Sequence, residues 1–149
     1  MEELFTLLLQ HLSEKLPAFS LIDEDYGQLE TDSDTYPVTF PCVLIGNLEG
    51  DWHSIGKHNE QKGTIVLSAK AAIDCYDDTH IGSGTEQRTE QRQRQANSLY
   101  KALQGFCPLP NDMTPLSRVK SRYYPLPGGI KVYEYIFQFR VQDTSACEA

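Results

Sequence analysis

Five residues have side chains and spacings that could serve metal or acid–base chemistry. They form two groups along the chain: His53, His58, Asp77, Asp78 and His80. Zinc sites need three or four ligands in a defined geometry, and the two histidines of the first group fall short of that number. The second group has a simpler interpretation as polar residues that end a strand. We therefore expect no catalytic residue, no metal and no cofactor. A small metal-dependent enzyme that combines both groups is kept as an alternative.

The acidic segment 20–36 could suggest a calcium-binding loop. It lacks the D-x-D-x-D-G order with a terminal glutamate that such loops use. We predict a solvated loop there, with a short strand near Ser20–Ile22 or Gly27–Glu30.

Composition limits the classes of function. The chain has 149 residues, of which 40% are hydrophobic and 23% are charged, as in a globular protein, and it is most simply one domain, 1–149. No apolar run approaches the roughly 20 residues of a membrane span, and the acidic N-terminus does not resemble an export signal. A net charge of −8 argues against a general nucleic-acid binder. We therefore expect no sequence-specific nucleic acid and no membrane as partners.

The charge is unevenly distributed along the sequence. Acids dominate as far as Asp34, and bases dominate from Arg88 to Arg140. Opposite charge at the two ends permits one end of a subunit to attract the other end of a neighbour. A solvated surface with uneven charge explains the pattern equally well.

Seven residues are candidates for a protein interface: Arg88, Arg92, Arg94, Arg118, Lys120, Arg122 and Trp52. The first three occupy the polar half of an expected helix. The next three alternate along an expected strand, so they should share one face, which would either protect a sheet edge or meet an acidic partner. The tryptophan is either tucked under a hairpin or part of a contact.

Strands with a period of two would position these residues. Segments 63–78 and 130–142 alternate apolar and more polar residues over unusual lengths, which predicts two long strands. Segments 36–48 and 116–124 are two further expected strands, with a bulge at Gly46. A polar connection joins the first of these to the central strand 63–78 in a long hairpin.

Two helices are expected to cover the sheet. Segment 2–16 repeats leucines at three- and four-residue spacing, which suits a helix on its own sheet better than a partner-binding helix. Segment 85–105 has an apolar stripe in its second half only, so its first half should project into solvent or onto a neighbour. The expected fold is α+β, with one antiparallel sheet of four to five strands and two helices packed on one face.

This layout resembles a family of phage proteins. The apolar first helix is followed by FPCVLIGNLEGDWHSIG and TIVLSAKAAIDCYDDTH, by a polar helix that ends in SLYKALQGF, and by TPLSRVKSRYYPLPGGIKVYEYIFQFRVQD. Together these segments resemble the tail terminator and tail-completion proteins of long-tailed phages and prophages.

The resemblance implies a structural role without catalysis. Such a subunit would form a homo-oligomeric ring, commonly a hexamer, that caps the tail tube, stops its growth and joins it to the head. Its partners would be copies of itself, the tail tube and the head–tail connector. It would be assembled in the cytoplasm of the bacterial host and end in the tail of the virion. A minor tail protein or a head–tail connector (neck) protein is the alternative within this class.

Overall fold

The structure is a computed structural model that describes residues 2–31, 35–75 and 87–147. Within these ranges the chain forms two helices and five strands. In chain order they are α1 (Leu4–Lys15), β1 (Leu21–Glu24), β2 (Cys42–Ile55), β3 (Glu60–Asp74), α2 (Gln87–Leu103), β4 (Ser117–Leu126) and β5 (Ile130–Asp143). The strands form one sheet in the order β1-β2-β3-β5-β4. The predicted α+β class is confirmed.

The sheet is mixed rather than antiparallel, which corrects the prediction. β1 pairs in parallel with β2, Leu21 lying opposite Cys42, whereas the other three pairs of neighbours are antiparallel. The long connection 25–41 explains the difference, because parallel neighbours need a connection that returns the chain to the same end of the sheet.

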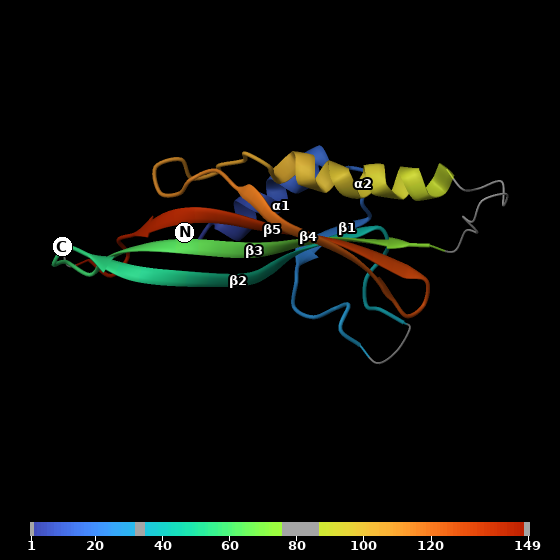
Figure 1. Cartoon of the computed structure of the whole chain (residues 1–149), viewed down its shortest axis with the longest axis horizontal. Helices are drawn as coiled ribbons and strands as arrows, with labels where there is room; N and C mark the ends of the chain where they lie inside the picture. Colours follow the sequence, from blue (N-terminus) through green and yellow to red (C-terminus); the bar gives the residue numbers. More distant parts are fainter. Residues whose placement is uncertain (1, 32–34, 76–86, 148–149) are drawn as a thin grey trace.

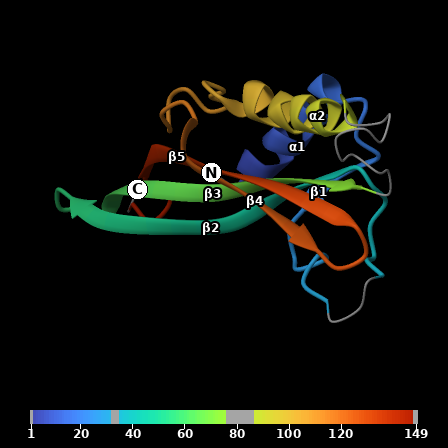
Figure 2. The same ribbon diagram turned by 45° about the vertical axis from the view of Figure 1, so that its right-hand side comes forward.

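The hairpin of β2 and β3 is longer than the sequence predicted. β2 continues through Ile55 into the segment that we expected to be a polar connection. A bulge interrupts the pairing between Gly46 and Glu49, at the place predicted for it. Gly56, with φ +68°, lies in the short turn that remains. The sequence of this part shows no alternation of apolar and polar residues, because both faces of β2 are exposed beyond the bulge. The far end of β2 extends past both helices (Figures 1 and 2).

The larger hydrophobic core lies between the helices and one face of the sheet. Figure 1 shows α1 and α2 side by side on the same side of the sheet. Leu8 of α1 and Leu99 of α2 are fully buried there, together with Leu67 of β3 and Phe137 of β5. The alternating apolar residues of the two long strands line this core: Ile65, Leu67, Ala69, Ala71 and Ile73 of β3, and Tyr133, Tyr135, Phe137, Phe139 and Val141 of β5.

The connection 25–41 covers part of the opposite face of the sheet, below the strands in Figure 1. Leu29 and Tyr36 from this connection pack with Leu44, Ala72 and Val132 in a second apolar cluster. The prediction of a solvated loop for 20–36 was therefore wrong at Leu29 and Tyr36, which are buried, whereas Tyr26, Glu30 and Thr35 are exposed as expected. The few apolar residues of this segment are spaced too irregularly to produce a periodic signal.

Candidate subunit interface

Strand β4 forms one edge of the sheet and is exposed along most of its length (Figure 2). It pairs with β5 on one side only. Pro125 fits this position, because proline cannot donate to a ladder and occurs in sheets at edge strands. Among the described residues no strand pairs with the outer side of β4, so that side is open to another strand.

A bulge in β4 separates the three cations that we expected on one face. Arg118 lies opposite Phe137, and Lys120 lies opposite Ile136, with the pairing shifted between them. Phe137 and Ile136 are successive residues of β5, and successive residues of a strand point to opposite faces. Their partners Arg118 and Lys120 therefore also lie on opposite faces. Arg122, two residues further on, shares the face of Lys120. The shared face predicted for all three was wrong, because the bulge adds Val119 to the strand.

Arg118 lies on the helix side of the sheet. Its guanidinium carbon is 3.8 Å from the centre of the Tyr100 ring of α2, in a cation–π arrangement. Its backbone N–H donates a hydrogen bond of 2.8 Å to the side chain of Gln104. These contacts attach the start of β4 to the last turns of α2.

Arg122 belongs to a network on the face opposite the helices. Its guanidinium pairs with Glu134, which is 2% exposed and also accepts a hydrogen bond from Ser68. Burial alone would raise the pKa of Glu134, but the hydrogen bonds from Ser68 and Arg122 outweigh it and hold the pKa below its usual value. Glu134 is therefore ionised at neutral pH, and Arg122 is held in place by it.

Lys70 extends this network to the connection 25–41. Its ammonium lies 2.9 Å from Oδ2 of Asp25, and both side chains are almost fully buried. Burial acts to lower the pKa of Lys70, but the hydrogen bond and charge of Asp25 prevail and leave the pKa raised. The ion pair fastens the start of the connection to the centre of the sheet.

Beyond the network the same face is open. A hollow of about 600 Å³ lies there, and its lining includes Lys120, Arg122, Leu48, Val66 and Ile136. The lining also includes the carboxylates of Glu49 and Glu134, so apolar side chains, cations and acids all border the hollow. Such a mixture of apolar and charged groups is compatible with a protein contact.

The cations of α2 form a separate group from those of β4. Arg88, Arg92 and Arg94 lie in the first two turns of the helix, six or more residues before Tyr100. Arg94 makes an exposed ion pair with Glu90. Arg92 is half-buried, and its charge opposes the rise in the pKa of Cys75 that burial produces. The structure thus separates the predicted basic surface into three parts.

Trp52 lies on the helix side of β2, beyond the bulge and opposite Gly63 of β3. Its side chain is 41% exposed. Its ring covers Gly63 so closely that a Cβ there would approach Cε3 of the indole to 2.7 Å. Of the two alternatives for this residue, the structure shows a ring laid flat on its own hairpin with one side open.

Two acidic residues near Trp52 were missed by sequence reasoning. Glu49 and Asp51 lie on β2 opposite Val66 and Thr64. They were overlooked because the segment was interpreted as a connection, where neighbouring residues have no common face. The alternation of the two acids would have been the signal.

The described residues contain only part of the set that the enzyme alternative needs. Asp77, Asp78 and His80 lie outside the described residues, and among those described no group of three potential metal ligands occurs. His53 pairs with Lys62 along the hairpin, and His58 lies in its turn. In the described parts of the chain, no helix is long and apolar enough to cross a membrane.

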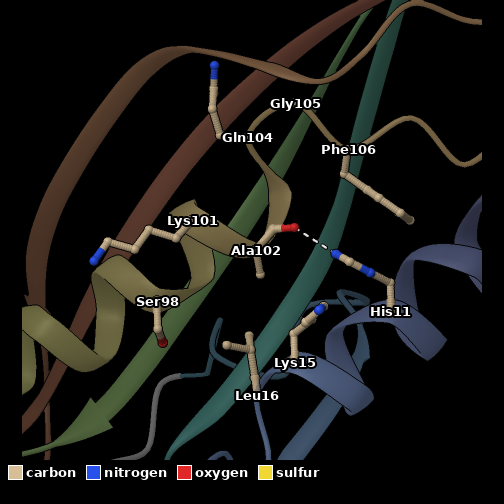
Figure 3. Close-up of a pocket in the computed structure, with 9 residues that line it drawn as sticks. All are labelled: His11, Lys15, Leu16, Ser98, Lys101, Ala102, Gln104, Gly105 and Phe106. Atoms are coloured by element: carbon tan, nitrogen blue, oxygen red, sulfur yellow. Dashed lines mark hydrogen bonds between the residues drawn. The ribbon is translucent and has the colours of Figure 1, made fainter.

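A groove of about 480 Å³ separates α1 from α2 and contains another histidine (Figure 3). Nε2 of His11 lies 2.7 Å from the backbone oxygen of Ala102. The imidazole stacks on Phe106 with 3.7 Å between ring centres. The groove is lined by lysines and amides without a carboxylate among the described residues that form it. His11 therefore serves to join the two helices.

Comparison with known proteins bears on the fold. No protein-family model matches the chain, and no curated protein is significantly similar to it. A chain from the virion of a native gene transfer agent particle has a similar structure, with a TM-score of 0.54 and 14% sequence identity. The similarity covers 94% of this chain and 95% of that one. The two proteins share a fold from end to end.

Proposed function

We propose that the protein is a structural subunit of a phage or phage-like virion, and that it acts as a tail terminator. The observation that carries the proposal is the end-to-end similarity in fold to a virion chain. The match covers 94% of this chain and 95% of the virion chain, so it involves the whole of the domain described here.

The surface of the described residues also supports a role in assembly. The sheet has an exposed edge at β4, and the open face beside it combines cations with apolar side chains. In this proposal the subunit forms a ring, commonly of six copies, which caps the tail tube and contacts the head–tail connector. The ring has no catalytic function.

Tube capping separates a terminator from other virion roles. Tail-tube protein that is polymerising is mixed with increasing amounts of this protein, and tube lengths are measured by electron microscopy. A terminator shortens the tubes and is found at one end of each. Tubes of unchanged length with the protein bound to connector rings instead would assign it to the neck.

Ring formation is measured by light scattering coupled to size-exclusion chromatography, at low and high salt. A species of about six subunits that dissociates with added salt supports an electrostatic contact between subunits.

The interface residues are tested by charge reversal. Lys120→Glu should weaken the ring, because Lys120 is exposed and makes no ion pair with the described residues of its own subunit. Arg122→Glu also breaks the pair with Glu134, so its effect on assembly must be separated from its effect on folding.

A further inference from the structure

Two edges of the sheet are open to another strand, and they lie on opposite sides of the subunit. β4 is the first. The second is the outer half of β2, because β1 covers only Cys42–Ile45 of that strand. The part of the chain described here contains no strand that pairs with the outer side of Glu49–Ile55. Side chains 47–54 are all exposed, whereas β1 is mostly half-buried.

Pro125 identifies which backbone groups of β4 point outward. Proline has no N–H, so its pair with Lys131 cannot be one in which both residues exchange N–H···O bonds. Antiparallel pairs alternate between bonded and non-bonded types. Ser121 and Tyr123 are therefore in non-bonded pairs with β5, and their N–H and C=O groups point away from the sheet. β4 is regular from residue 120 to residue 126, after the bulge, and this stretch is as long as 49–55 of β2.

The charges on the two edges are complementary and lie on the same face. Lys120 and Arg122 are opposite Ile136 and Glu134 on β5. Through β3 the same face continues to Glu49 and Asp51 on β2. A joined sheet that keeps this face would bring cations of one copy beside carboxylates of the next. Side chains of opposite charge that face each other on neighbouring strands stabilise the pairing of those strands.

Exposed apolar side chains concentrate on the same two strands. Among the described residues, five large hydrophobic side chains are exposed, and four of them lie on β2 or β4. These four are Leu48 (38%), Trp52 (41%), Val119 (53%) and Tyr123 (50%). Trp52 and Tyr123 are both on the helix side of the sheet, where they could meet across a joint. Aromatic residues are enriched at protein interfaces.

We propose that subunits join by strand addition, with β4 of one copy pairing with residues 49–55 of β2 in the next. The inference rests on the proposed ring and specifies its joint. The strand order makes the added pair antiparallel, since β4 runs opposite to β2 in the sheet. One continuous sheet then passes through all subunits, with two different edges meeting at each joint, as a closed ring requires.

A proline substitution on the outer side of β4 tests the backbone part of the joint. Ser121→Pro removes an outward N–H and leaves the bonds to β5 in place, whereas Ser121→Ala keeps that N–H and serves as the matched control. Light scattering at low salt should show rings for the control and monomers for the proline variant, and circular dichroism should show both folded. In the wild type, hydrogen exchange at the Ser121 and Tyr123 amides should slow on assembly.

A charge exchange tests the side-chain part and does not depend on how the proline variant folds. Lys120→Glu and Asp51→Lys should each weaken assembly roughly 2- to 30-fold in dissociation constant, and the double variant should recover most of the loss. Edge pairing is refuted, while the ring remains, if Ser121→Pro assembles as well as Ser121→Ala and the double charge variant assembles no better than the single charge variants. A wild type that stays monomeric at low salt and high concentration also refutes it, and tube capping then decides the proposed function separately.

Discussion

The buried ion pair between Asp25 and Lys70 should control how firmly the connection 25–41 holds to the sheet. Asp25 is fixed from three sides. Its backbone N–H donates to Ile45 at 2.8 Å, its Oδ1 accepts from the N–H of Gly27 at 3.0 Å, and its Oδ2 meets Lys70. Replacing one charge leaves the other buried without its main partner. Asp25→Asn and Lys70→Met are the appropriate changes, because each keeps much of the shape of the side chain.

Removing one member of a buried pair costs about 3–5 kcal/mol of unfolding free energy. Asp25→Asn should lie near the lower limit, since the charge of Glu134 still acts on Lys70 and the amide oxygen of asparagine can accept from Gly27. The double variant buries no member of the pair as an ion, so it should cost about 2 kcal/mol less than the sum of the single variants. For a chain of this size, about 3–5 kcal/mol lowers the melting temperature by about 6–20 °C.

Urea denaturation followed by far-UV circular dichroism at pH 7 measures these free energies. The pKa of Lys70 is raised in the folded state, so its contribution is complete below about pH 10 and is lost only as the pH rises further. Lys62→Met, at an exposed position in the same strand, is the control and should stay within about 0.5 kcal/mol of the wild type. Single variants that each cost under about 1 kcal/mol, or strict additivity, would refute the reasoning.

Three further predictions concern the core and the hairpin. Cys42 is fully buried and burial raises its pKa to about 12, so iodoacetamide should not label it in the native protein, as peptide mass spectrometry would show. Gly63→Ala should displace the ring of Trp52 and shift its fluorescence to longer wavelength, with little loss of stability because the ring can move into solvent; an unchanged spectrum would contradict the contact. Glu134 has a lowered pKa, so its contribution to stability is present above about pH 4.3 and lost on acidification, and Glu134→Gln should flatten the acid limb of a stability–pH profile.

The long strands and the helices could be predicted because their side chains repeat. In β3 and β5 one face is buried under the helices, so alternate positions must be apolar, and the pattern shows directly in the sequence. The stripe of α1 reflects the same core. The last turns of α2 carry a stripe for the same reason, and its first turns do not because they are exposed.

Features that depend on the backbone or on distant contacts could not be predicted. β1 pairs with β2 because of the path that the connection 25–41 takes, and the apolar residues of this connection do not repeat at a regular spacing. The bulge at Val119 follows from pairing with β5, and no glycine marks it. Because that bulge decides which face each cation takes, the candidate interface was identified by residue type and wrongly arranged in space.

The corrected arrangement also favours one mode of assembly over another. If β4 paired with β4 of a second copy about a twofold axis, Lys120 and Arg122 of both copies would lie along the same joint, and like charges on neighbouring strands are destabilising. Pairing with the acidic edge at Glu49 and Asp51 removes that repulsion. The edge cations therefore oppose a symmetric dimer and favour head-to-tail contact, which is the geometry that a ring needs. The same charges protect the free subunit from indiscriminate edge pairing before it meets a neighbour.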